Sequence, residues 1–167
     1  MRNFDGFYKG IDLGGWISQC GKNYNDEHYS TFITEKDIEK IASMGLDHVR
    51  MPVDYNVIQT EDGKLIESGM AYIENCVNWC KKHGLNIVID LHKTCGYIFD
   101  DPTYCGFFAN EKLQDQFVYL WQEIAKRYGN DEHIAFELLN EVTSADFTDS
   151  WNKIASRTAK EIRKIAP

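Results

Sequence analysis

The segment Gly84-Leu-Asn-Ile-Val-Ile-Asp-Leu91 is a short apolar run that starts with a Gly-Leu pair, and Gly45-Leu-Asp-His-Val-Arg-Met-Pro-Val53 opens in the same way. Short, nearly continuous runs rich in Ile, Val and Leu are typical of strands buried on both faces of a parallel sheet. Two further runs of this kind occupy residues 7–13 and 134–139. The sequence therefore predicts four strands, and the shared Gly-Leu start marks a faint internal repeat.

Segments with helical spacing separate and follow these predicted strands. Apolar residues recur every three or four positions in 38–42, 72–80 and 117–124, and a fourth such segment runs from about Ser150 to Pro167. The predicted order is then βαβαβαβα. Four such units with right-handed crossovers form either half of an eight-stranded TIM (βα)8 barrel or a complete small doubly wound sheet.

Residues that cap helices stand at the ends of these segments. Thr34 with Asp37 resembles a capping box, and Asn110 can cap the third helix. Glycines stand where three helices should stop, at Gly45, Gly84 and Gly129. These signals place the element boundaries to within a few residues.

Two features favour the half barrel, an α/β fold, over the doubly wound sheet. The first strand-to-helix connection, residues 14–33, is long and aromatic and lacks the glycine-rich phosphate loop of nucleotide-binding sheets. Polar residues also cluster at the carboxyl ends of all four predicted strands, where barrel enzymes carry their chemistry. These residues are Asp12, Arg50, Asp90, His92, Asn140 and Glu141. A flavodoxin-like domain, in which the strand order would differ, is the weaker alternative.

Composition and charge limit the classes of protein to which the chain can belong. The 167 residues are 43% hydrophobic, which is enough apolar material for one core, so we expect residues 1–167 to form a single unit. With 18 basic and 26 acidic residues the net charge is -8, which argues against nucleic acid or an anionic membrane as a partner. No stretch approaches the roughly 20 apolar residues of a membrane helix.

The N-terminal residues and the cysteines indicate a compartment. Residues 1–10 lack the apolar segment of a signal peptide. The five cysteines are odd in number and lack the spacing of a disulfide framework, which fits reduced thiols. We therefore expect a cytoplasmic chain, while secretion of a longer parent protein stays open.

Four motifs occur in a fixed order: Gly10-Ile-Asp-Leu-Gly-Gly-Trp16, His48-Val-Arg-Met-Pro-Val53, Ile89-Asp-Leu-His92 and Phe136-Glu-Leu-Leu-Asn-Glu141. In order and spacing this set resembles glycoside hydrolase family 5, the cellulase family, over essentially the whole chain. The resemblance implies the N-terminal half of that family's barrel. It also implies a retaining hydrolase that acts on β-1,4-glucans or cello-oligosaccharides and uses no cofactor and no metal.

The resemblance assigns roles to four polar residues at the predicted strand ends. Glu141 matches the general acid/base, and Asn140 matches the residue that binds the sugar 2-hydroxyl. Arg50 matches the arginine that orients the nucleophilic carboxylate, and His92 matches a histidine that lines the sugar site. The structural alternatives are a buried carboxylate for Glu141, an ion pair at the core edge for Arg50, and a purely structural ring for His92.

Aromatic residues in the loops offer flat faces that can bury the apolar face of a glucose ring. Trp16 is the first candidate for such substrate binding, with packing of its loop as the alternative. Other loop aromatics that could extend a sugar-binding cleft, or equally pack the loops, are Tyr55, Tyr97, Phe99 and Tyr104. The helix aromatics expected in the core are Trp79, Trp121 and Trp151.

The family's nucleophile is not among these assignments. A retaining glycosidase needs two carboxyl groups about 5 Å apart, and the resemblance implies that the second one lies on strand seven. Glu137 cannot replace it, because four residues along a strand span about 13 Å. We therefore expect a truncated hydrolase with weak or no activity alone. The alternative is a non-catalytic carbohydrate-binding or half-barrel assembly fragment.

A half barrel would leave its first and fourth strands as open edges. Exposed strand edges recruit partners. A twofold homodimer, or an exchange of elements between two copies, would complete eight strands and cover both edges. We therefore expect a homodimer, with β-glucan or cello-oligosaccharide as the other partner.

Overall fold

The computed structural model describes residues 5–101 and 103–167. Residues 1–4, which belong to the N-terminal stretch where no signal peptide is expected, lie outside the described residues. The described residues contain a four-stranded sheet. Its strands are β1 (Gly10–Asp12), β2 (His48–Asp54), β3 (Asn86–Lys93) and β4 (Ile134–Glu137).

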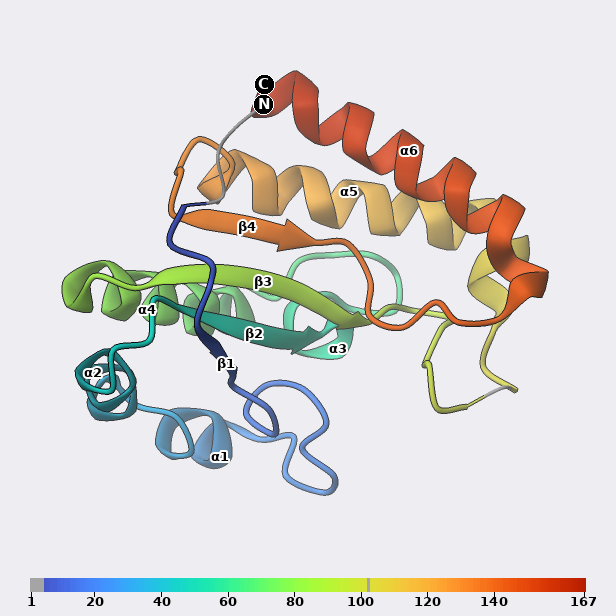
Figure 1. The fold of residues 1–167 in the computed structure, drawn as a ribbon. Coiled ribbons are helices and arrows are strands. Elements are labelled where there is room, and N and C mark those ends of the chain that lie inside the picture. The colour runs from blue at the N-terminus through green and yellow to red at the C-terminus, as the bar shows by residue number, and fades with distance from the viewer. Residues whose placement is uncertain (1–4, 102) are drawn as a thin grey trace.

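The strands lie side by side in chain order, and each neighbouring pair is parallel (Figure 1). In the register of these pairs Asp12 lies beside Arg50, and Asp90 lies beside Glu137. A doubly wound sheet has a point at which the strand order reverses, and the order β1-β2-β3-β4 has no such point. The half-barrel prediction is therefore confirmed, and the flavodoxin-like alternative is wrong.

Four helices follow the strands as predicted. They are α2 (Glu35–Ser43), α4 (Glu67–His83), α5 (Glu111–Tyr128) and α6 (Thr148–Ile165). In Figure 1, α5 and α6 lie side by side above β4, at one end of the row of strands. The helix α2 lies near the opposite end of that row, by β1 and β2. Across residues 5–101 and 103–167, no helix combines the length and the apolar character that crossing a membrane requires.

The predicted helix caps are present. Thr34 donates from its backbone nitrogen to Asp37 Oδ2 at 2.8 Å, which forms the capping box of α2. Asn110 Oδ1 accepts from the backbone nitrogens of Lys112 and Leu113 at 3.1 and 3.4 Å, and so caps α5. Gly84 ends α4 in the left-handed conformation, with φ 71°, which glycine adopts without steric cost.

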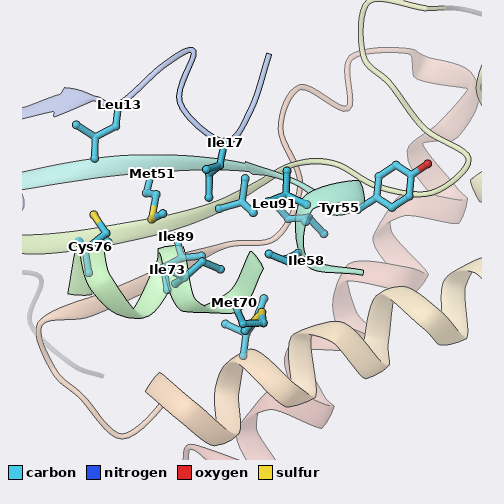
Figure 2. Close-up of a cluster of buried hydrophobic side chains, with 14 of the residues drawn as sticks. Leu13, Ile17, Met51, Tyr55, Ile58, Met70, Ile73, Cys76, Ile89 and Leu91 are labelled. Carbon is cyan, nitrogen blue, oxygen red and sulfur yellow. The ribbon is translucent and has the colours of Figure 1, made fainter. Parts of the chain in front are cut away.

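The apolar core lies between the sheet and its helices. Met51 of β2 and Ile89 of β3 are at most 1% exposed, and they gather with Ile73 and Cys76 of α4 (Figure 2). Each fully buried aliphatic side chain of this kind contributes about 1.5 to 3 kcal/mol. Successive side chains of a strand alternate between its faces. The neighbours of these core residues, among them Asp90, therefore point to the opposite, concave face of the sheet.

Short elements in the connections were not predicted. They are α1 (Asp26–Thr31), α3 (Tyr55–Ile58), η1 (Gly106–Ala109) and η2 (Ala145–Phe147). None exceeds two turns of helix, so none carries the repeated apolar spacing that identifies a helix in a sequence. The predicted first strand, residues 7–13, is also shorter than expected, because only Gly10–Asp12 pairs with β2.

Candidate active site

Arg50 of β2 lies at the centre of a charged network on the concave face. Its Nε and Nη2 donate to the two carboxylate oxygens of Glu137 on β4, both at 2.8 Å. Its Nη1 donates to Asp12 Oδ1 of β1 at 3.1 Å, and its Nη2 lies 2.9 Å from Asp90 Oδ2 of β3. The Glu137 hydrogen bonds are the main cause that raises the pKa of Arg50. A permanent positive charge therefore ties all four strands together.

Asp90 connects this network to His92. Its side chain is fully buried, and its Oδ2 lies 2.7 Å from His92 Nδ1. Removal from water raises the pKa of Asp90, while the hydrogen bond to His92 and the charge of Arg50 act in the opposite direction. The ionised carboxylate is the form that both neighbours favour.

Three buried polar atoms in and beside this network lack a partner among the described residues. They are Oδ1 of Asp90, Nε2 of His92 and Nδ2 of Asn140, whose residues are 0%, 6% and 5% exposed. Asn140 Oδ1 accepts from Arg50 Nη2 at 3.0 Å, so only one end of this amide is satisfied. More than about 90% of buried polar groups in proteins have a partner. The nitrogen atoms of His92 and Asn140 are therefore candidate ligand contacts.

Glu141 follows Asn140 just after the end of β4. The residue is exposed, which excludes the alternative of a buried structural carboxylate. Its backbone has φ 48°, in the left-handed region that non-glycine residues seldom adopt. The hydroxyl of Tyr97 donates to the Glu141 carbonyl oxygen at 2.7 Å. Unusual backbone conformations that the surroundings hold in place cluster at functional sites.

The structure corrects the prediction for Trp16. Its side chain is 0% exposed, and its ring stacks against Trp79 with 6.0 Å between the ring centroids. Its Nε1 donates to the Tyr29 carbonyl oxygen at 2.7 Å. Burial of this large apolar ring, with its one polar atom paired, anchors the connection 14–33 to the core. Trp16 therefore offers no face to a sugar ring in this structure.

Some of the other loop aromatics pack in the core, and others lie beside the candidate site. Tyr55 and Tyr97 are buried, whereas Phe99 and Tyr104 are half-buried. The ring of Phe99 stands edge-on to His92, with 5.6 Å between centroids. Two of these loop aromatics thus contact candidate site residues: Phe99 contacts the His92 ring, and Tyr97 contacts the Glu141 backbone. Of the helix tryptophans, Trp121 is fully buried as predicted, and the other two are half-buried against the core.

A second buried carboxylate, Asp54 at the end of β2, holds the connection 14–33 beside the site. It accepts from Ser18 Oγ at 2.7 Å, from the backbone nitrogen of Gln19 at 3.0 Å, and from the Tyr24 hydroxyl. Lys93 Nζ lies 3.3 Å away. Burial and the hydrogen bond to Asp54 raise the pKa of Tyr24. No local pattern in the sequence indicates this anchor, because its hydrogen-bond partners Ser18, Gln19 and Tyr24 come from a loop.

Sequence reasoning also missed the partner of Arg50. The resemblance implied a nucleophilic carboxylate at this guanidinium, whereas Glu137 occupies two of its nitrogens here. The signal that could have found Glu137 is its place as a charged residue within the apolar run 134–139, in register with Asp90. Charged residues inside buried strands need a charged partner.

A half barrel with a charged network and unpartnered polar atoms at the carboxyl ends of its strands has the arrangement of a (βα)8-barrel enzyme site. The model of the family described as Cellulase (glycosyl hydrolase family 5) matches residues 12–167. The chain therefore belongs to glycoside hydrolase family 5, as its motifs predicted.

Two curated relatives are similar to most of the chain. Cellodextrinase A of Ruminococcus flavefaciens is 52% identical over 165 residues, which cover 97% of this chain and 48% of that protein. Endoglucanase C of Acetivibrio thermocellus is 50% identical over 162 residues, which cover 95% of this chain and 47% of that protein. The chain thus spans about half the length of the curated relatives it matches.

Solved structures support the same fold. The structure of Thermotoga maritima Cel5A in complex with cellobiose, in a mutant form, superposes with a TM-score of 0.77 at 23% identity, covering 97% of this chain and 52% of that one. A structure described as an endoglucanase gives 0.76 at 20% identity, covering 97% of this chain and 49% of that one. At such identities these likenesses bear on the fold alone.

Proposed function

We propose that residues 1–167 supply the acid/base half of a retaining hydrolase that acts on β-1,4-glucans or cello-oligosaccharides. The observation that carries this proposal is the position of Glu141, exposed on a kinked backbone directly beside Asn140, whose buried Nδ2 has no partner among the described residues. The names of the relatives, a cellodextrinase and an endoglucanase, favour a cellulose-type glucan as the substrate.

In this proposal Glu141 gives its proton to the glycosidic oxygen as the bond breaks, and then accepts a proton from the attacking water. Asn140 Nδ2 donates to a sugar hydroxyl, and His92 Nε2 meets another hydroxyl. The ring of Phe99 stands edge-on to His92 on the same side of the site. The reaction needs a second carboxylate about 5 Å from the first. Glu137 is held by Arg50 through both oxygens, which argues against it as that nucleophile.

It follows that the 167-residue chain alone hydrolyses β-glucosides weakly or not at all.

We also propose that the chain by itself forms a twofold homodimer, in which β1 of each copy pairs with β4 of the other. Its support is the exposure of all three residues of β1 and the partial exposure of β4. Unpaired parallel edges of this kind favour association.

The second candidate function is a non-catalytic module that binds carbohydrate. The observation that favours it is the pair of unpartnered polar atoms on His92 and Asn140, which can bind sugar hydroxyls without any nucleophile. This second function predicts that the chain, mixed with a complementary half barrel, binds cellotetraose but does not hydrolyse it.

The experiment that tests the main proposal combines this chain with the remaining half of Cellodextrinase A of R. flavefaciens and measures hydrolysis of a fluorogenic β-cellobioside. We expect activity in the mixture, with Glu141→Gln lowering it by about 10²- to 10⁴-fold, the usual contribution of a general acid/base. The matched control is Glu132→Gln, an exposed glutamate that precedes β4 at its opposite end. Equal activity of Glu141→Gln and Glu132→Gln would exclude Glu141 as the acid/base.

A further inference from the structure

We propose that Asp90 is a positioning residue that fixes the ring tautomer of His92 and, through Arg50, the orientation of the Asn140 amide, so that the site presents one acceptor and one donor to a sugar. The inference rests on the proposed function only in naming a sugar as the ligand. The hydrogen-bonding states of His92 and Asn140 are properties of the protein itself and can be measured without any substrate.

The first step is the pair of contacts that Asp90 makes. Its carboxylate is 0% exposed, and a single oxygen, Oδ2, lies 2.7 Å from His92 Nδ1 and 2.9 Å from Arg50 Nη2. An ionised carboxylate only accepts hydrogen bonds. Because the guanidinium of Arg50 stays charged, it favours the ionised form of the carboxylate between itself and His92.

The second step concerns the His92 ring. An acceptor at 2.7 Å from Nδ1 places the proton of the neutral ring on Nδ1. The other nitrogen, Nε2, then carries a lone pair and no proton. Nε2 is buried and lacks a partner among the described residues. A neutral His92 therefore presents an acceptor, which pairs with the O–H of a sugar hydroxyl.

The third step concerns Asn140. Arg50 Nη2 donates to its Oδ1 at 3.0 Å, and a guanidinium has no acceptor for an amide N–H. The amide oxygen must therefore face Arg50, and the amide nitrogen must face away from it. Because Asp90 and Glu137 both contact the same Nη2, they hold the guanidinium in the position that orients Asn140.

The two unpartnered nitrogen atoms of this network then have opposite hydrogen-bonding polarity. Nε2 of His92 accepts on β3, and Nδ2 of Asn140 donates just after β4, with Asp90 and Arg50 joining them behind the site. Buried polar groups that are fixed in this way reject ligands that leave them unpaired, because each unpaired group costs about 1 to 3 kcal/mol. Asp90 is thus expected to determine which hydroxyl pattern the site accepts.

The test is nitrogen-15 NMR of the histidine rings of the 167-residue chain near pH 7.5. We expect His92 of the wild type to carry its proton on Nδ1, and Asp90→Ala to move most of the population to Nε2-protonated rings. His48 is an internal control, because Asp47 Oδ1 lies 2.7 Å from its Nδ1 and Asp90 takes no part in that pair. A wild-type His92 ring protonated on Nε2 would overturn the proposal whether or not the variant folds.

Titration of the same samples with cellotetraose separates this inference from the proposed function. We expect Asp90→Ala to weaken cellotetraose binding at least tenfold relative to wild type, and Asp90→Asn, which keeps an acceptor oxygen, to recover part of it. If Asp90→Ala switches the His92 tautomer but leaves the affinity for cellotetraose unchanged, the fixed acceptor on His92 does not contribute to sugar binding, and that part of the proposal is overturned. A wild type with the expected tautomer that binds no cellotetraose would contradict the proposed function and leave the positioning by Asp90 standing.

Discussion

Glu141, which directly follows Asn140 in the chain, adopts a left-handed backbone conformation with φ 48° that its side chain disfavours. A non-glycine residue in the left-handed region costs of order 1 kcal/mol or more, so neighbouring groups must hold it there. Tyr97 does so through its hydrogen bond to the Glu141 carbonyl oxygen. Its ring is itself fixed, because it stands edge-on to Phe108 and Phe147. Burial raises the pKa of the Tyr97 hydroxyl, which keeps it protonated as a hydrogen-bond donor.

We predict that Tyr97→Phe destabilises the chain by about 1 kcal/mol, the net value of a typical buried hydrogen bond, and loosens the backbone at Glu141. Denaturant unfolding gives the first quantity, and amide hydrogen exchange at residues 140–142 gives the second. Tyr55→Phe is the matched control, because its hydroxyl faces Tyr104 at 3.4 Å and not Glu141. Unaltered exchange at 140–142 in Tyr97→Phe would show that the kink does not depend on this hydrogen bond.

Among single residues, the sequence predicted best those whose position a strand determines. Arg50 lies inside β2 and His92 lies near the end of β3, and Asp90, which contacts both side chains, connects them. Trp16 was misplaced because the burial of a loop residue depends on the path of the loop. That path is set by distant contacts such as those of Asp54 with Ser18 and Gln19, which no local pattern records.

At the scale of elements, helices in contact with the sheet were predictable and short helices in the loops were not. The apolar spacing of α4 and α5 reports directly the face that each helix buries. The helix α1 has six residues, and a tertiary hydrogen bond from Trp16 Nε1 to the Tyr29 carbonyl oxygen connects it to the core. The start of α4 also needs Gly69, since a Cβ there would lie 1.8 Å from the Val57 carbonyl oxygen at the end of α3.

The contact between α2 and α4 includes an ion pair whose contribution depends on pH. Glu35 Oε1 lies 2.5 Å from Lys82 Nζ and 3.2 Å from His83 Nε2. The hydrogen bond from Lys82 is the main cause that lowers the pKa of Glu35 below its usual 4.5. A carboxyl with a lowered folded-state pKa stabilises the fold above its unfolded pKa. That stabilisation is lost as the pH falls through the lowered value.

We therefore predict that the wild type has a higher Tm than Glu35→Gln above about pH 5, and that the difference between them shrinks as the pH falls below 4.5. Thermal unfolding followed by circular dichroism at a series of pH values measures this difference. Glu132→Gln, at an exposed position, serves as the control and should show no comparable trend. A difference between wild type and Glu35→Gln that stays constant down to acid pH would rule out the ion pair as its source.

Over the whole molecule, the sheet of the half barrel has one apolar face and one charged face. The outer face of the sheet is covered by α4 and α5, whereas the concave face carries Asp12, Arg50 and Glu137. The apolar runs predict strands that are buried on both faces, and β3 is buried along most of its length. Its inner face is nevertheless polar, because it forms the candidate site. That 1–167 form a single folding unit stays a prediction.

The open edge at β1 is the place where the proposed homodimer can be tested by mutation. Ile11 lies in the middle of β1 and is 45% exposed, although large aliphatic residues inside strands are usually buried. In a dimer that pairs β1 with β4 of the second copy, this side chain would be covered. A lysine at an edge strand opposes such pairing, because its ammonium resists removal from water.

We predict that the wild-type chain sediments as a dimer at micromolar concentration, and that Ile11→Lys raises the dissociation constant at least tenfold, which corresponds to about 1.4 kcal/mol. Tyr119→Lys, which replaces a 41% exposed aromatic residue on α5, is the matched control and should leave the dimer intact. Equal weakening by both substitutions would mean that association depends on general surface hydrophobicity. A monomeric wild type at these concentrations would mean that the edges of this half barrel are stable without a second copy.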